Sequence, residues 1–83
     1  MTEAESFAFL TTLLQRVFER KDITATPDLT AKDVFGWDSF KQVELIMEIQ
    51  DALGFEFTTD EMDNIENVGA LARIVRAHVN KSA

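Results

Sequence analysis

Hydrophobic residues recur at helical spacing in three separate stretches of the chain. The first stretch begins after Thr2 and Glu5, which fit a capping box, and its apolar residues continue to about Arg20. The second stretch covers residues 39–53 and stops at Gly54, a residue type that commonly ends helices. Both patterns predict amphipathic helices.

The third stretch forms the C-terminal part of the chain. Asn67 can cap a last helix, whose predicted buried stripe is Val68, Leu71, Ile74, Val75 and Val79. Before it, Thr58 and Glu61 fit a second capping box, which predicts a brief helix through about Ile65. Residues 55–57 are too few to predict a strand.

A long non-periodic segment, residues 21–37, separates the first two predicted helices. Pro27 interrupts it, and Ile23, Leu29, Val34 and Phe35 are its isolated apolar anchors. Long loops of this kind are usually functional, so its end is where chemistry is expected. The whole pattern predicts an all-α fold: one domain, residues 1–83, built as a small antiparallel four-helix bundle with three longer helices and one short third helix.

The charge of the chain limits its partners. Its 83 residues carry a formal net charge of −7, and residues 33–66 hold ten acids and one base, Lys41, so this segment carries −9. Phosphate backbones and anionic leaflets would be repelled, which excludes nucleic acid and membrane insertion and favours proteins with basic patches. The chain has no Cys, no membrane-length apolar run and an acidic N-terminus, so we expect a cytoplasmic location.

The second predicted helix has an apolar arc wider than a small bundle needs. Phe40 and Met47 lie at the edge of this arc, beside Glu44, Glu48 and Asp51. One interpretation is a docking surface, in which two large apolar side chains are flanked by three carboxylates. The alternative is a solvated acidic face with both apolar side chains in the core.

The start of this helix carries the candidate chemistry. In the sequence Gly36-Trp37-Asp38-Ser39-Phe40, either Asp38 or Ser39 can cap the helix, and the Ser39 hydroxyl lies at the positive end of the helix dipole. Backbone N–H groups there favour an attached phosphate. Alone, the motif is weak evidence, and helix capping by these two residues is the simpler interpretation.

Several motifs together make the chain resemble the acyl carrier protein family, from about Asp33 to Val75. They are Gly36-Trp37-Asp38-Ser39-Phe40, Val43-Glu44-Leu45-Ile46-Met47, Phe55-Glu56-Phe57 and Asp60-Glu61. The resemblance implies a four-helix carrier, not an enzyme, whose Ser39 receives a 4′-phosphopantetheine arm from coenzyme A. The thiol of the arm then carries an acyl group as a thioester.

The resemblance also implies roles for individual positions. Asp38 corresponds to the acid that the phosphopantetheinyl transferase recognises, and Glu44 and Asp51 occupy acidic docking positions. Phe40 and Met47 match the exposed apolar contacts, whereas Glu48 is assigned to this surface by helical geometry alone. Asp63 and its neighbours extend the acidic surface, and Ile65 lies near the entrance for cargo.

The implied partners are enzymes of fatty-acid, polyketide or related lipid biosynthesis. They are the phosphopantetheinyl transferase, an acyl-loading ligase or acyltransferase, and a ketosynthase or other enzymes with basic patches, which a monomeric carrier would visit in turn. Two alternatives stay open: an aminoacyl or peptidyl carrier, and a helical adaptor without a prosthetic group.

Four residues depart from the pattern usual in general fatty-acid carriers: Trp37, Phe40, Lys41 and Thr58. Trp37 is bulky for its position, and Lys41 stands where an acid is common. These departures suggest a specialised carrier that serves a dedicated pathway. On that hypothesis, Lys41→Asp improves turnover by a general fatty-acid ketosynthase.

Other chemistries fit less well. A serine hydrolase needs a base beside its nucleophile, but the only His, His78, lies far along the last helix and is expected to be a half-exposed helix residue. The acids of residues 60–66 lack the alternating spacing and the glycine of a calcium loop. We therefore expect neither catalytic residues nor a metal site.

Overall fold

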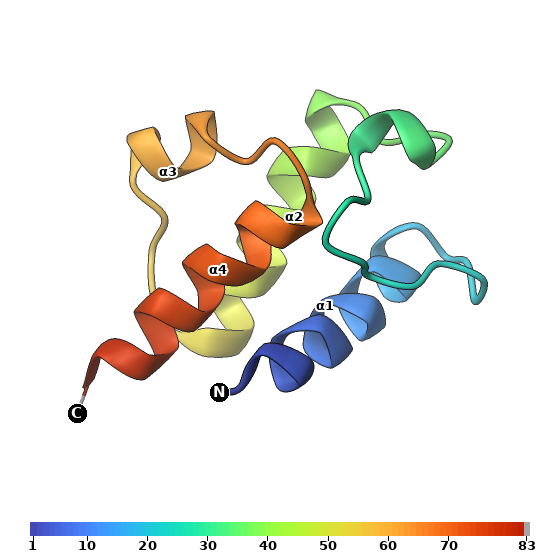
Figure 1. Ribbon diagram of the computed structural model, residues 1–83. Helices are drawn as coiled ribbons and strands as arrows, with labels where there is room; N and C mark the ends of the chain where they lie inside the picture. The colour runs from blue at the N-terminus through green and yellow to red at the C-terminus, as the bar shows by residue number, and fades with distance from the viewer. Residues whose placement is uncertain (83) are drawn as a thin grey trace.

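The computed structural model describes residues 1–82 and folds them into four α-helices (Figure 1). These are α1 (Glu3–Val17), α2 (Ser39–Leu53), α3 (Thr59–Asp63) and α4 (Val68–Val79), with short 3-10 helices at Ala31–Asp33 and Asn80–Ser82. No residue of the described chain is in a strand. The predicted all-α bundle with a short third helix is confirmed. Ala83, the last residue of the predicted domain, lies outside the described residues.

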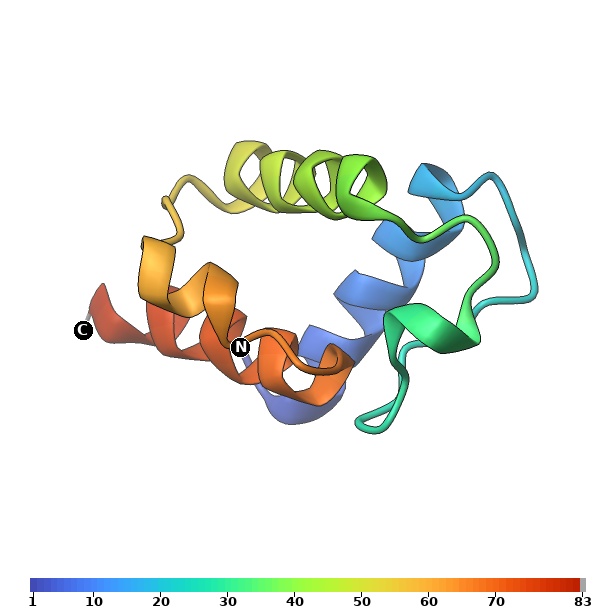
Figure 2. The same ribbon diagram turned by 90° about the horizontal axis from the view of Figure 1, so that it is seen from above.

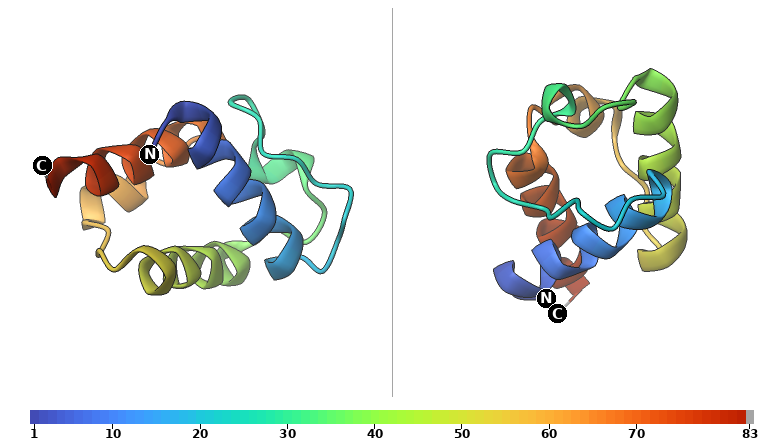
Figure 3. Two further views of the ribbon diagram at one scale, coloured as in Figure 1. Left: turned by 90° about the horizontal axis from the view of Figure 1, so that it is seen from below. Right: turned by 90° about the vertical axis from the view of Figure 1, so that its right-hand side faces the viewer.

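Helix α1 is the element against which the other two long helices pack. It runs in the opposite general sense to α2 and α4, which share a direction (Figures 1 and 2). The bundle is therefore antiparallel for the pairs that include α1. Both ends of the described chain lie at the same end of the molecule (Figure 3), where the Asn80 side chain donates to the Met1 carbonyl at 2.9 Å.

All four helices begin at the predicted caps. Thr2 and Thr58 form capping boxes, Asp38 accepts from the Lys41 N–H, and Asn67 accepts from the N–H three residues on. Such side chains satisfy backbone N–H groups that a helix start leaves unpaired. At the end of α2, Gly54 has a left-handed φ of 75°, which glycine adopts without strain.

Two helices end earlier than the sequence predicts. Helix α1 stops at Val17 and not near Arg20, because Glu19 takes a left-handed φ of 54° that no helix can continue. Helix α3 stops at Asp63 and not near Ile65. There the Asn64 side chain donates back to a carbonyl of α3 at 2.7 Å, which competes with further helical hydrogen bonds.

The core lies between α1, α2 and α4 and is apolar except for Ser6. The Ser6 hydroxyl is fully buried, donates to the Glu3 carbonyl and accepts from Arg76 of α4. Its pairing removes the cost of burying a polar group. The largest fully buried apolar side chains are Leu10, Leu14, Leu45, Ile49, Val68, Leu71 and Val75. Of the predicted stripe of α4, Val68, Leu71 and Val75 are buried, whereas Ile74 and Val79 are partly buried.

The long connection between α1 and α2 is anchored much as predicted, with one exception. Ile23 and Val34 are buried and Leu29 is partly buried, but Phe35 is 93% exposed, so its assignment as an anchor was wrong. The adjacent Val34 already fills the core position, and neighbouring residues of an extended backbone point in opposite directions.

Backbone hydrogen bonds attach this connection to the first turn of α4. The Val68 N–H donates to the Leu29 carbonyl at 2.8 Å, and the Gly69 N–H donates to the Pro27 carbonyl at 3.0 Å. A Cβ at position 69 would lie 2.7 Å from that Pro27 oxygen, so only glycine permits the approach. The connection is thus held in place and delivers its end to the start of α2.

Candidate functional site

Ser39 is the first residue of α2, and its side chain is exposed. Asp38 precedes it as the N-cap, with its Oδ1 accepting from the Lys41 N–H at 3.0 Å. Gly36 turns the chain at a φ of 89°, and its carbonyl accepts from the Asp38 N–H at 3.1 Å. Of the two capping residues that the sequence allowed, Asp38 caps the helix, which leaves the Ser39 hydroxyl available for chemistry.

Trp37 fixes the approach to Ser39. Its ring packs against Phe18 with centroids 5.5 Å apart, and its indole N–H donates to Gln42 Oε1 at 2.8 Å. The bulk of this side chain therefore ties the connection to α2 and to the end of α1. Trp37, whose size departs from the pattern of the carriers that the sequence resembles, is therefore a packing residue.

The five residues assigned to a docking surface lie together. Phe40, Glu44, Met47, Glu48 and Asp51 line one shallow hollow of about 370 Å³ along the outer face of α2, with Val43 between them. Phe40 is 86% exposed and Met47 60%. The alternative that placed these two side chains in the core was wrong, because Leu45, Ile46 and Ile49 already fill the inner face of α2.

The three carboxylates of this hollow differ in their partners. Glu48 pairs with Arg16 of α1 at 3.0 Å, and Glu44 pairs with Lys41 at 3.4 Å. Asp51 is exposed and has no ion-pair partner within residues 1–82. Of the three predicted docking acids, Asp51 therefore presents the least compensated charge.

A separate groove of about 420 Å³ lies between α2 and α3. It is mostly apolar and is lined by Ser39, Gln42, Val43, Ile46, Met47, Gln50 and Met62. Ile65, expected near the cargo entrance, lines an adjoining hollow together with Asp38 and Ser39. The exposed serine and an apolar groove are thus next to one another.

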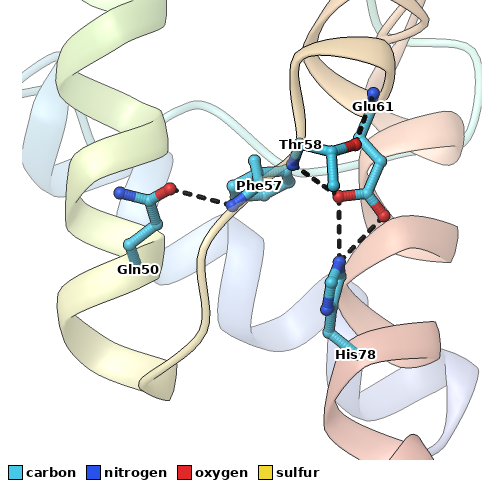
Figure 4. A network of polar contacts seen from close by, with 5 residues as sticks. All are labelled: Gln50, Phe57, Thr58, Glu61 and His78. Carbon is cyan, nitrogen blue, oxygen red and sulfur yellow. Dashed lines mark hydrogen bonds and ion pairs between the residues drawn. The ribbon is translucent and has the colours of Figure 1, made fainter.

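His78 is partly buried, as the sequence predicted, but it has contacts that the sequence did not indicate. Its Nε2 lies 2.8 Å from Glu61 Oε2 (Figure 4). Its ring stacks on Phe55 with centroids 4.2 Å apart. The pKa of the Glu61 carboxyl is lowered, mainly by the hydrogen bond from the Thr58 N–H and secondly by the hydrogen bond to His78. Because α3 buries no residue of its own, this polar contact helps to attach α3 to α4.

Sequence reasoning missed Gln42, Gln50 and Met62 as groove residues. A signal was present for the two glutamines: at 100° per residue they fall with Ser39 and Ile46 within one arc of about 80° on α2. No local pattern indicates Met62, because its place opposite α2 depends on how the chain folds back.

The described residues were expected to contain neither a metal site nor a membrane-spanning helix. Within residues 1–82 no three His, Asp or Glu side chains are grouped so that they could hold a metal ion. Over the same residues, none of the helices has the length and apolar content that crossing a bilayer requires.

Known proteins resemble this chain over most of its length. A family model described as a phosphopantetheine attachment site matches residues 8–75. An acyl carrier protein of Lactobacillus johnsonii is 29% identical over 80 residues, which are 96% of this chain and all of that protein. The solution NMR structure of the holo acyl carrier protein of Geobacter metallireducens superposes with a TM-score of 0.88 at 28% identity, over 92% of this chain and 87% of the other.

The matches extend over the part of the chain that contains Ser39. The matched range contains the whole of α2 together with the connection that leads to it, and the fold agrees over nearly the full chain. The carriers of this family bind phosphopantetheine and are not enzymes. The chain belongs to the phosphopantetheine attachment-site family of acyl carrier proteins.

Proposed function

We propose that Ser39 is the residue that carries the phosphopantetheine arm. The observation that supports this most directly is the exposed Ser39 hydroxyl at the first position of α2, beside the groove between α2 and α3. The other serine with a described side chain, Ser6, is fully buried and engaged in two hydrogen bonds. It is therefore inaccessible to a modifying enzyme.

The residues around Ser39 suit the prosthetic group. The first turn of a helix leaves N–H groups unpaired, and these, with the positive end of the helix dipole, favour the phosphate of the arm. When bound, the arm supplies a thiol that holds an acyl group as a thioester. The protein positions the attachment point, and the adjoining groove offers the acyl chain apolar surface away from water.

We further propose that the hollow on the outer face of α2 docks the partner enzymes. It combines exposed Phe40 and Met47 with the carboxylates of Glu44, Glu48 and Asp51. An apolar centre with an acidic rim complements a basic patch with an apolar pocket. The candidates are the transferase, which we expect to recognise Asp38, a loading ligase or acyltransferase, and a ketosynthase of fatty-acid, polyketide or related lipid synthesis.

We also propose that the carrier is a single monomeric domain, because it visits several enzymes in turn. We propose a cytoplasmic location, where it would meet coenzyme A and the transferase. The packing of α2 and α4 on α1 supports the single domain.

Intact-mass measurement tests the attachment site. The purified protein is incubated with coenzyme A and a broad-specificity phosphopantetheinyl transferase, and we expect one added arm. Ser39→Ala should remove the gain, whereas Ser6→Ala, a matched loss of one hydroxyl, should keep it. No gain with the unaltered chain would favour the adaptor without a prosthetic group. A gain that persists in Ser39→Ala would show that the arm is attached at another residue, and would overturn the assignment of Ser39.

A further inference from the structure

The groove between α2 and α3 is not uniformly apolar. Val43, Ile46, Met47 and Met62 supply its apolar wall, but two residues with polar side chains, Gln42 and Gln50, also line it. Polar groups in a site meant for a plain hydrocarbon chain need an explanation, because each keeps water bound until something replaces that water.

The orientation of both carboxamides is determined by what they accept. The Trp37 indole N–H donates to Gln42 Oε1 at 2.8 Å, and the Phe57 N–H donates to Gln50 Oε1 at 2.9 Å. Both donors can only donate, so each must face a carboxamide oxygen and not its nitrogen. Figure 4 shows the Gln50 nitrogen on the side of the carboxamide away from Phe57.

Each glutamine therefore keeps an NH₂ group for another partner. Within residues 1–82, neither Nε2 atom makes a hydrogen bond and neither is sealed from solvent without one. A saturated chain that filled the groove would strip water from these donors and return nothing. A chain with an oxygen at that point would replace the lost hydrogen bond, and sites built to pair a polar group discriminate strongly against ligands that lack it.

We propose that this groove takes acyl chains that bear a keto or hydroxyl oxygen, and that the Gln50 NH₂ group is the donor that recognises this oxygen. The inference rests on the proposed attachment at Ser39. Gln42 lies one turn from Ser39, where the arm, when bound, would compete for its donor. Gln50 lies roughly 16 Å from Ser39 along α2, so its donor is left for the cargo.

The test compares two cargoes on the same protein. Ser39 is loaded with pantetheine analogues that carry, through a stable amide link, either a saturated chain or a chain of equal length with keto groups at alternate carbons. Side-chain NH₂ signals are followed by ¹H–¹⁵N NMR. We expect the keto chain, and not the saturated chain, to shift the Gln50 signals. Gln15, which donates to the carbonyls of Lys21 and Ile23 elsewhere, is the internal reference and should not move.

Variants at position 50 give an independent measurement. Gln50→Met removes the donor, and the partner lost by the Phe57 N–H is the same with either cargo, so it cancels between them. We expect the melting midpoint of the keto-loaded protein to fall by about 4 °C more than that of the saturated form. Gln50→Glu, which keeps an oxygen for the Phe57 N–H but has no NH₂ group, should show the same order.

The outcomes separate the two proposals. If intact mass shows no loading at Ser39, the proposed function fails and the cargo inference falls with it. If loading succeeds but the Gln50 signals respond equally to both chains, only the cargo inference is overturned. Equal midpoint changes for the two cargoes in both variants would overturn it in the same way, and the NMR comparison decides the matter if a variant does not fold.

Discussion

At the scale of single residues, Lys41 changes its meaning once the fold is known. It is the one base in the acidic middle of the chain, but its ammonium group turns toward α1. There it donates to the Val17 carbonyl at 3.1 Å, lies 5.9 Å from the centre of the Phe18 ring and pairs with Glu44. A cation at the C-terminal end of a helix is favourable, so Lys41 links α2 to α1.

This link predicts that Lys41→Met lowers the free energy of unfolding by about 1 kcal/mol, the usual cost of losing one such charge-assisted contact. Urea denaturation followed by circular dichroism measures the change. Lys32→Met, at an exposed lysine of the Ala31–Asp33 turn, is the control and should cost less. Equal effects of the two substitutions would contradict the link.

The gain in ketosynthase turnover expected for Lys41→Asp stays a prediction. It now carries a condition, because a carboxylate at position 41 would face the Val17 carbonyl instead of donating to it. Turnover should therefore be compared at a temperature where both forms are fully folded.

Gly69 provides a second prediction at this scale, because its replacement by alanine should change the stability in the opposite direction to that usual in a helix. Replacing glycine by alanine in a helix normally stabilises it by roughly 0.5–1 kcal/mol. Here the new Cβ would meet the Pro27 oxygen at 2.7 Å, so we expect Gly69→Ala to destabilise the fold by about 1–3 kcal/mol. A rise in the unfolding midpoint would show that the connection yields without cost.

At the scale of elements, α2 presents two surfaces from one helix. Its outer face carries the exposed docking residues, and the side that follows Ser39 lines the groove toward α3. The wide apolar arc seen in the sequence is explained by these two surfaces together with the core, since Val43 and Met47 line both the hollow and the groove.

The ion pairs of α2 predict an order among its acids. Glu48 is already compensated by Arg16, whereas Asp51 has no ion-pair partner in the described part of the chain. Asp51→Asn should therefore reduce kcat/KM for loading by the transferase several-fold more than Glu48→Gln does, and the difference should shrink at high salt. Equal losses from the two neutralised acids would indicate that the Arg16 pair does not persist in solution.

At the scale of the whole molecule, polar contacts of Glu61 join α3 to the rest of the bundle beside the groove. Helix α3 buries none of its residues, and Glu61 holds it through its own cap at Thr58 and through His78 of α4. The Thr58 N–H and His78 lower the pKa of Glu61 in the folded state. A lowered carboxyl pKa contributes stability above the unfolded value, near 4.3, and this contribution is lost as the pH falls through the folded value.

This linkage predicts a stability that falls on acidification below about pH 5. Urea unfolding at a series of pH values measures it. Glu61→Gln should flatten the slope between about pH 5 and pH 3, whereas Glu56→Gln, at an exposed acid outside the helices, should leave it nearly unchanged. An unaltered slope in Glu61→Gln would show that other carboxylates govern acid unfolding.

The starts of the helices could be predicted from the sequence because each cap acts within three residues of the chain. Thr2, Asp38, Thr58 and Asn67 pair with backbone N–H groups that their own helices supply. The same local chemistry placed Ser39 at the start of α2. The helix ends were less accurate, since Glu19 adopts a conformation that no nearby residue type announces.

What the sequence determined by itself was the set of helices, their caps, the acidic middle segment and an exposed serine motif. Only the tertiary structure decided that Phe40 lies outside the core, that Lys41 faces α1, that His78 meets Glu61 and that Gln50 turns its oxygen to Phe57. The reason is the range of the interactions. Caps and periodicity join near neighbours, whereas burial, ion pairing between helices and the direction of a carboxamide depend on segments that meet only after the chain has folded.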